Sequence, residues 1–325
     1  MKIYYHNDDD GRCAAAIVYR ELRSIFDEMD LLAFKEYNLD PNTLAIDDFR
    51  KGETVYIVDI PLDDGIYKKV IKPAIKAGAK VVHIDHHEET LEYLKHMRYK
   101  NIMAQVTTFY KLGISGSLLA WVYSLMNEDE RRDPNNVAFD FSEQTTHIAF
   151  NLNEVNRREY KIPDVIRFIN DNDVQTFELE ESKYFTLGFQ SEKDKHPLSD
   201  VWNNLIYAST SREVYQLVNN GKIIWDYQES INKSLRINNA FTIHLEGVSC
   251  FCLNNAYDKA QIFGDLLDAF PMVCVFHYTG KQGIWHYSLY SSEKEIGIDV
   301  SEIAKKFGGD GQFHTAEFNI KKFIF

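Results

Sequence analysis

The sequence predicts an α/β fold, with a doubly wound, mostly parallel sheet in an N-terminal domain and a smaller α/β domain at the C-terminus. Strand-like and helix-like segments alternate from residue 2 to residue 87, the pattern of a parallel sheet with crossover helices. A polar helical stretch over 201–240 precedes a second set of strand-like segments. The chain has 325 residues, which is long for a single core. We expect domains at 1–200 and 241–325, joined by a helical connector over 201–240.

The charge balance narrows the class of partner. The chain carries 49 acidic side chains against 36 Lys and Arg, a net charge of −13 with His neutral. Such a surface repels long polyphosphate backbones unless a local basic groove overrides it, so a long nucleic acid duplex is a disfavoured substrate. No run approaches the roughly 18 apolar residues that a membrane span needs, and the start of the chain lacks the apolar core of a signal peptide. No membrane partner is expected.

The cysteines favour a cytoplasmic location. They are few and show no disulfide framework: Cys13, Cys250, Cys252 and Cys274. Cys250 and Cys252 lie two residues apart on a predicted strand, which would place both on one face of a sheet. A redox or zinc role for them lacks the second pair or the histidine that would complete a four-ligand zinc set. A reducing cytoplasm is the simpler prediction.

Acids gather at the first predicted strand end. Lys2–Tyr5 reads as a strand, and the segment His6-Asn7-Asp8-Asp9-Asp10-Gly11 follows it directly, before an alanine-rich helix that begins near Arg12. One carboxylate suits the N-terminus of that helix. Helix capping does not account for three consecutive acids. Packed carboxylates repel one another unless a cation neutralises them, so the segment indicates a bound cation.

Two further strands also end in polar residues. The apolar strand over 53–58 is followed by Asp59 and, two residues later, by a proline, and the strand Val81–Ile84 is followed by Asp85-His86-His87. In a parallel sheet the carboxyl ends share one edge, which is where ligands bind. We therefore expect one site to collect His6, Asp8, Asp10, Asp59, Asp85, His86 and His87.

Two later segments are candidates for the same edge. Gly113–Trp121 opens a helix with small residues, and its Ser115 either belongs to a phosphate cradle or caps the helix. The apolar helical stretch over 166–169 runs into Asn170-Asp171-Asn172-Asp173, which offers two more acids.

The C-terminal part reads as strands over 241–253, 272–278 and 284–291, then a short helix over 300–307. The glycine-rich segment over 308–314 follows the helix. Its backbone N–H groups could approach an anion closely, and the alternative is a flexible hairpin.

Acids and imidazoles at successive strand ends describe a two-metal phosphoesterase centre. This ligand set suits two divalent cations, best Mn²⁺, with Mg²⁺, Co²⁺ or Zn²⁺ as alternatives. Two ions about 4 Å apart can activate a hydroxide for attack on a phosphate ester.

The same residues resemble the DHH phosphoesterase family with a DHH-associated C-terminal domain, in its oligoribonuclease, nucleotide phosphatase and exopolyphosphatase-related branch. The resemblance covers nearly the whole chain. It is carried by the segment His6–Gly11, Asp59, the triplet Asp85-His86-His87, Gly113–Gly116, Asp173 and Gly308–Gly311.

The resemblance implies a catalytic metal-binding domain, a substrate-binding domain and an active-site cleft between them. Asp8, Asp59 and His6 would hold one metal. Asp10, Asp59, His86 and Asp173 would hold the other, with Asp171 as the alternative to Asp173. Asp85 would orient the neighbouring imidazoles, and His87 would contact the scissile phosphate.

Two departures from the family concern the grip on substrate. Gln312 stands where the glycine-rich turn of the family ends in histidine, and Tyr290 stands where an arginine often follows Ser-Leu. Gln312 carries no charge, and Tyr290 could stack a base where arginine would clamp an anion. The expected substrate-binding residues are Gly308, Gly309, Gly311, Gln312, His314, Tyr290 and Ser115.

The function that follows is hydrolysis of a small nucleotide: a short single-stranded oligonucleotide, a linear or cyclic dinucleotide, or an adenosine bisphosphate. The first alternative is a polyphosphatase or inorganic pyrophosphatase, which would require several Lys or Arg side chains near Gln312. A RecJ-like exonuclease would need an extended basic groove. An alternative of another class is a nucleotide-binding protein with weak or no hydrolysis. A homodimer is compatible with the sequence.

Overall fold

The structure is a computed structural model that describes residues 1–22, 33–37, 48–95, 100–142, 145–151, 157–256, 260–292, 294 and 296–325. The chain divides into two compact units, Met1–Ile223 and Ile224–Phe325. The boundary falls inside the long helix α10 (Arg212–Asn238), within the predicted connector.

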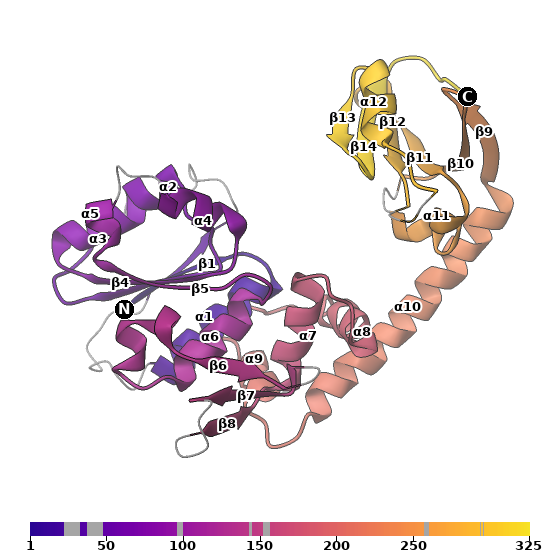
Figure 1. The fold of residues 1–325 in the computed structure, drawn as a ribbon. Coiled ribbons are helices and arrows are strands. Elements are labelled where there is room, and N and C mark those ends of the chain that lie inside the picture. Colours follow the sequence, from indigo (N-terminus) through magenta and orange to yellow (C-terminus); the bar gives the residue numbers. More distant parts are fainter. Residues whose placement is uncertain are drawn as a thin grey trace. The chain divides into compact units, whose positions relative to one another are not determined.

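The first unit is built on a five-stranded sheet in the order β2-β1-β3-β4-β5, with every neighbouring pair parallel. Helices cover both faces (Figure 1). One core contains α1 and α6, and the other contains Val70 and Ala74. The predicted doubly wound, mostly parallel sheet is therefore confirmed. Its strands are β1 (Lys2–His6), β2 (Ala33–Tyr37), β3 (Thr54–Val58), β4 (Lys80–Asp85) and β5 (Val106–Tyr110). Its helices are α1 (Asp9–Leu22), α2 (Asp64–Ile66), the π-helical turn Tyr67–Ile71, α3 (Lys72–Ala77), α4 (Glu88–Lys95), α5 (Lys100–Met103) and α6 (Gly116–Leu125).

A small antiparallel sheet and three helices complete the first unit. The sheet has the order β6-β7-β8. It is followed by α7, whose end carries the acids predicted at 170–173. The elements are the 3₁₀ turns Glu130–Arg132 and Pro134–Asn136, β6 (Phe139–Phe141), β7 (His147–Phe150), β8 (Arg158–Lys161), α7 (Asp164–Asp173), α8 (Glu180–Phe189) and α9 (Asp200–Ile206).

The second unit is a mixed six-stranded sheet in the order β13-β14-β12-β11-β10-β9, in which only the β10–β11 pair is parallel. The single strand expected over 241–253 is two strands, because Glu246 and Gly247 take positive φ values of 52° and 83° and turn the chain back. The elements are β9 (Ala240–Leu245), β10 (Val248–Asn254), the 3₁₀ turn Ala260–Phe263, α11 (Leu266–Ala269), β11 (Met272–Thr279), β12 (Ile284–Tyr290), α12 (Val300–Lys306), β13 (Asp310–Gln312) and β14 (Thr315–Ile320).

Helices α8 and α10 touch through their backbones at two glycines. A Cβ on Gly188 would lie 2.0 Å from the carbonyl oxygen of Leu217, and one on Gly221 would lie 1.7 Å from that of Tyr184. No side chain fits there, so these two positions fix how the first half of α10 packs against α8 within the first unit.

We expect Gly188→Ala and Gly221→Ala each to lower the free energy of unfolding by about 1–3 kcal/mol, the usual cost of overpacking. Helix propensity alone would change stability by about 1 kcal/mol in the opposite direction. Urea denaturation measures the difference. Gly280→Ala is the control, because a Cβ at Gly280 meets nothing within 4 Å. Unchanged or raised stability in the two helix variants would contradict this packing.

Candidate metal centre

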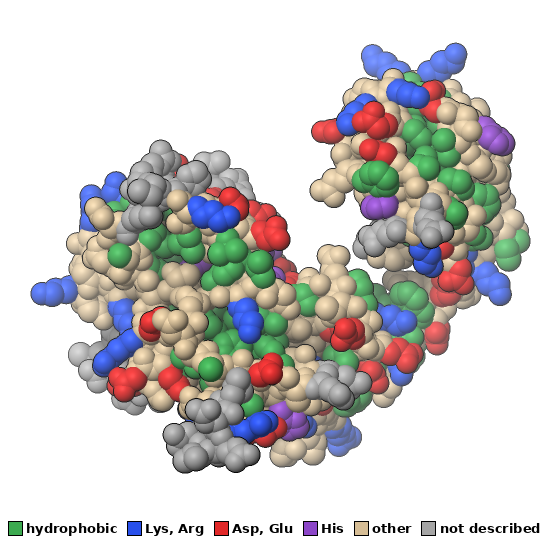
Figure 2. Space-filling model, in the orientation of Figure 1, with side chains coloured by type: hydrophobic (Ala, Val, Ile, Leu, Met, Phe, Trp, Pro, Cys, Tyr) green, Lys and Arg blue, Asp and Glu red, His purple; other side chains and the backbone are tan. Residues whose placement is uncertain are grey.

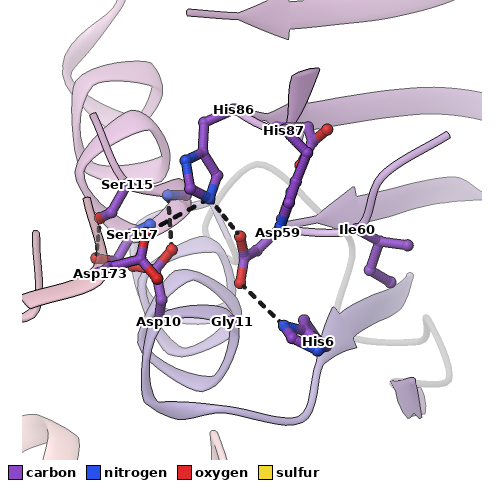
Figure 3. A network of polar contacts seen from close by, with 12 residues as sticks. His6, Asp10, Gly11, Asp59, Ile60, His86, His87, Ser115, Ser117 and Asp173 are labelled. Atoms are coloured by element: carbon purple, nitrogen blue, oxygen red, sulfur yellow. Dashed lines mark hydrogen bonds and ion pairs between the residues drawn. The ribbon is translucent and has the colours of Figure 1, made fainter. Parts of the chain in front are cut away.

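The predicted strand-end residues do meet at one edge of the five-stranded sheet. His6 ends β1, Asp59 follows β3, and His86 follows β4. Asp10 comes from the first turn of α1, and Asp173 is the last residue of α7. Figure 3 shows these side chains turned toward one another.

Asp59 lies at the centre of this group. Its Oδ2 is 3.7 Å from His6 Nδ1, and its Oδ1 is 3.2 Å from His86 Nε2. The side chain is almost fully buried, and the backbone has a φ of 56°. A left-handed conformation in an aspartate costs free energy and is found at functional sites more often than elsewhere. Asp59 is therefore positioned to serve two ligand groups at once.

The N-terminus of α6 holds Asp10. The backbone N–H of Gly116 donates to Asp10 Oδ2 at 2.7 Å, and that of Ser117 donates to Oδ1 at 3.0 Å. Ser115 is fully buried, caps α6 by accepting from the Leu118 N–H at 3.3 Å, and so follows the capping alternative. The amides that would cradle a phosphate thus bind a carboxylate of the chain.

Gly116 also permits the close approach of the acids. A Cβ at this position would lie 2.7 Å from Asp59 Cβ and 3.0 Å from Asp10 Oδ2. Only glycine leaves room for both carboxylates at this end of α6. The sequence pattern Gly-x-Ser-Gly suggested small capping residues, but it did not reveal this contact.

The remaining acids separate into those inside and those outside the centre. Asp8 Oδ2 lies 2.6 Å from His6 Nδ1, and Asp173 Oδ2 lies 3.5 Å from His86 Nε2. Asp9 instead pairs with Lys195 Nζ at 3.0 Å. Asp171, the alternative to Asp173, is buried and accepts hydrogen bonds from the loop that follows α7.

His87 is oriented by hydrogen bonds that run through the buried side chains of Asp85 and Thr90. Its Nδ1 lies 2.7 Å from Asp85 Oδ1, and the Thr90 hydroxyl donates to the other oxygen of Asp85. Thr90 in turn accepts from the Leu62 N–H at 2.9 Å. Burial lowers the pKa of His87, but the hydrogen bond and charge of Asp85 outweigh it, so the pKa ends above its usual value. Thr90 was missed at the sequence level, because a threonine in the first turn of a helix is ordinary there.

The donor atoms fit divalent cations. Three sets of ligand atoms each lie within 4.8 Å of one another: His6, Asp8 and Asp59; Asp10, His86 and Asp173; and Asp59, His86 and His87. Three buried atoms of these residues, His6 Nδ1, Asp59 Oδ1 and Asp173 Oδ2, lie close to charged partners but make no hydrogen bond of good geometry with the part of the chain that the structure describes. Buried polar atoms are normally bonded, and two cations, one at the His6 set and one at the Asp173 set, would account for all three.

Without a cation, the ionised forms of the buried acids of the centre are disfavoured. Burial, and next the charge of Asp10, raise the pKa of Asp59 well above its usual value. The same two causes raise the pKa of Asp173 to about 8, while the carboxylates of Asp59 and Asp8 raise the pKa of His6 to about 10. The metal-free centre therefore keeps protons that ligand atoms would have to release.

We expect the affinity for Mn²⁺ to rise with pH. Because metal ligands must be deprotonated, binding would release a proton from Asp173 below pH about 8 and one from His6 below pH about 10. Each released proton increases the association constant by about tenfold per pH unit. Isothermal titration of Mn²⁺ between pH 6 and 8 in buffers of different ionisation enthalpy measures both the affinity and the protons released. An affinity independent of pH would contradict the proposed ligands.

All but one of the predicted substrate residues of the second unit line an open groove of about 790 Å³. Tyr290 and Gln312 are among its lining residues, as are Gly308, Gly309 and Gly311. The groove contains the acids Asp310 and Glu317 and no Lys or Arg among those lining residues. His314 is outside the set and contacts Ser291 Oγ through Nδ1 at 3.1 Å. Lys305 and Lys306 pair with Glu302 and Glu246.

The surface seen in Figure 2 carries Lys and Arg side chains scattered among Asp and Glu. In the coloured, described part of that face they form no continuous basic groove. None of the described helices combines the length and the hydropathy needed to cross a membrane.

The solved structures that are similar to this chain include the following three. A pGpG-specific phosphodiesterase from Vibrio cholerae is 10% identical, with a TM-score of 0.49 over 98% of this chain and 92% of that one. RecJ with Mn²⁺ from Thermus thermophilus is 13% identical, with a TM-score of 0.42 over 98% and 49%. A putative family II inorganic pyrophosphatase from Methanococcus jannaschii is 10% identical, with a TM-score of 0.32 over 97% and 93%. No family model and no curated protein matches the sequence.

Proposed function

We propose that this chain is a metal-dependent phosphoesterase of the class that its motifs resemble, the DHH phosphoesterases. The observation that carries the proposal is the position of Asp59, which shares its two oxygens between His6 on one side and His86 on the other. Asp8 completes the first set of ligands, and Asp10 with Asp173 completes the second. Carboxylate and imidazole donors together suit Mn²⁺, which we propose as the native ion.

The proposed chemistry divides between the ions and the chain. Two bound divalent cations would lower the pKa of a water and stabilise the oxygens of an in-line displacement. His87, fixed through Nδ1 by Asp85, would present Nε2 to the scissile phosphate. Its raised pKa favours the protonated imidazole, which suits contact with a phosphate oxygen.

A short nucleotide is the proposed substrate. Polyphosphate and pyrophosphate call for clustered cations, whereas the groove of the second unit has two acids and no Lys or Arg among its lining residues. Tyr290 and the glycine-rich backbone are better suited to a base and a sugar than to several phosphates.

A substrate panel with Mn²⁺ tests the proposal. It compares dinucleotides, an adenosine bisphosphate, pyrophosphate and polyphosphate by product chromatography, together with thermal melting with and without Mn²⁺. We expect metal-dependent hydrolysis with a preference for the dinucleotides. Stabilisation by Mn²⁺ without turnover of any of them would favour the nucleotide-binding alternative. A preference for polyphosphate or pyrophosphate would favour the other enzyme class.

We expect Tyr290→Arg to change the ranking of these substrates. A guanidinium in the groove would improve the kcat/KM ratio of pyrophosphate to dinucleotide by about tenfold, since a charged hydrogen bond contributes about 1.5–3 kcal/mol. Gln312→His should act in the same direction. Tyr278→Arg is the control, because Tyr278 is exposed and lies outside the lining of the groove. An unchanged ranking would mean that Tyr290 does not touch the substrate.

A further inference from the structure

The loop that joins α7 to α8 has an unusual backbone. Gln175 has a φ of 56° and Phe177 a φ of 50°. Both are residues with a Cβ, for which the left-handed conformation costs free energy, and glycine would adopt it more cheaply. Phe177 is also 61% exposed to solvent. A large apolar ring is therefore exposed to solvent in a loop whose backbone is strained.

Asp171 keeps the loop in this conformation. Its Oδ1 accepts from the Thr176 hydroxyl and from the Glu178 N–H, both at 2.8 Å. Its Oδ2 accepts from the Leu179 N–H at 3.3 Å and from the Ser182 hydroxyl. Its backbone carbonyl accepts from the N–H of Phe177 at 3.4 Å. One buried carboxylate thus uses both oxygens to hold a loop that presents an exposed ring.

The loop starts at the metal centre. Asp173 is the last residue of α7 and belongs to the ligand set with Asp10 and His86. The Phe177 N–H donates to the backbone carbonyl of Asp171, so the loop returns against the last turn of α7, which ends at the ligand Asp173. A nucleotide whose phosphate is bound by this ligand set could therefore extend over the loop.

We propose that Phe177 is a specificity-determining residue that stacks on a base of the substrate. The inference rests on the proposed function and extends it, because it supplies a base-recognition contact on the first unit. A single exposed aromatic residue needs no explanation. Phe177 does need one, because it combines a strained backbone, a buried carboxylate that holds the loop, and a position beside the ligand-bearing turn of α7. Strained backbone persists where the surrounding structure enforces it, and it clusters at functional sites. Stacking on an aromatic ring accepts any base, so Phe177 would select for nucleotides over base-free phosphates.

The test uses an RNA dinucleotide and its abasic analogue, which has the same sugar-phosphate backbone and no bases, with Mn²⁺ present. We expect Phe177→Ala to lower the kcat/KM ratio of the dinucleotide to the analogue by about 5- to 150-fold, as expected for loss of one stacked base. The loss should fall on KM for the dinucleotide. Phe177→Tyr should restore the ratio, and Tyr227→Ala, which removes a 69% exposed ring from α10, should leave it at the wild-type value.

The outcomes separate the two proposals. If the wild type hydrolyses the dinucleotide and Phe177→Ala keeps the wild-type ratio, the stacking role is wrong and the proposed function stands. A ratio that falls equally in Phe177→Ala and Phe177→Tyr would also contradict stacking and point to the loop backbone. If the wild type hydrolyses neither compound, the proposed function fails and the stacking role fails with it. Thermal melting of each variant with Mn²⁺ checks that the centre is intact.

Discussion

Asp59→Asn is expected to lower kcat/KM on a dinucleotide by on the order of a thousandfold or more, because the lost charge served both ligand sets. The amide has nearly the same size, and the core around it is otherwise unchanged. Asp59 makes no hydrogen bond through Oδ1 with the described residues, so folding does not depend on that atom. The effect should therefore fall on metal binding and turnover.

Stability should respond in the opposite direction. Burial, then the charge of Asp10, raise the pKa of Asp59 in the folded protein, so its ionised form destabilises the metal-free fold as pH rises above the unfolded value. Melting of the metal-free Asp59→Asn protein at pH 8 should match or exceed that of the wild type. Mn²⁺ should raise the melting temperature of the wild type by more than it raises that of Asp59→Asn. Wild-type turnover in the variant, or an equal shift with Mn²⁺, would exclude Asp59 as a shared ligand.

Gly116→Ala is expected to lower kcat/KM by on the order of a hundredfold, the loss associated with a displacement of about 1 Å at a catalytic site. The added methyl would lie 2.8 Å from Asp59 Oδ1 and 3.0 Å from Asp10 Oδ2, so at least one carboxylate must move. The loss should appear in metal affinity as well as in turnover.

The matched control for Gly116→Ala is Gly280→Ala, which adds the same methyl group where nothing lies within 4 Å. Metal titration and steady-state kinetics on both variants separate a local effect from a general one. Full activity and wild-type affinity in Gly116→Ala would mean that the acids of the centre have room that the structure does not give them.

Convergence at the sheet edge could be predicted from the sequence because two simple regularities determine it. Apolar strands alternate with helices, so the strands are parallel, and parallel strands bring their carboxyl ends together. His6, Asp59 and His86 followed from this alone. The edge strands β2 and β5 and the small sheet β6-β7-β8 were missed, because short strands with mixed polar residues have no clear period.

The choice between Asp171 and Asp173 could not be made from spacing. Residues two apart on a helix point about 200° apart, so only one of them can face the centre, and the packing of α7 decides which. In the structure Asp173 faces His86, and Asp171 faces the following loop. The role of the Gly116 and Ser117 amides was equally hidden, because it depends on α6 meeting α1 across more than a hundred residues of sequence.

Anomalous diffraction from a crystal soaked in Mn²⁺ tests the paired metal centre most directly. The predicted result is two peaks about 4 Å apart, both in contact with Asp59, one also bound by His6 and Asp8 and the other by Asp10, His86 and Asp173. Peaks elsewhere on the protein, with none in contact with Asp59, would contradict it.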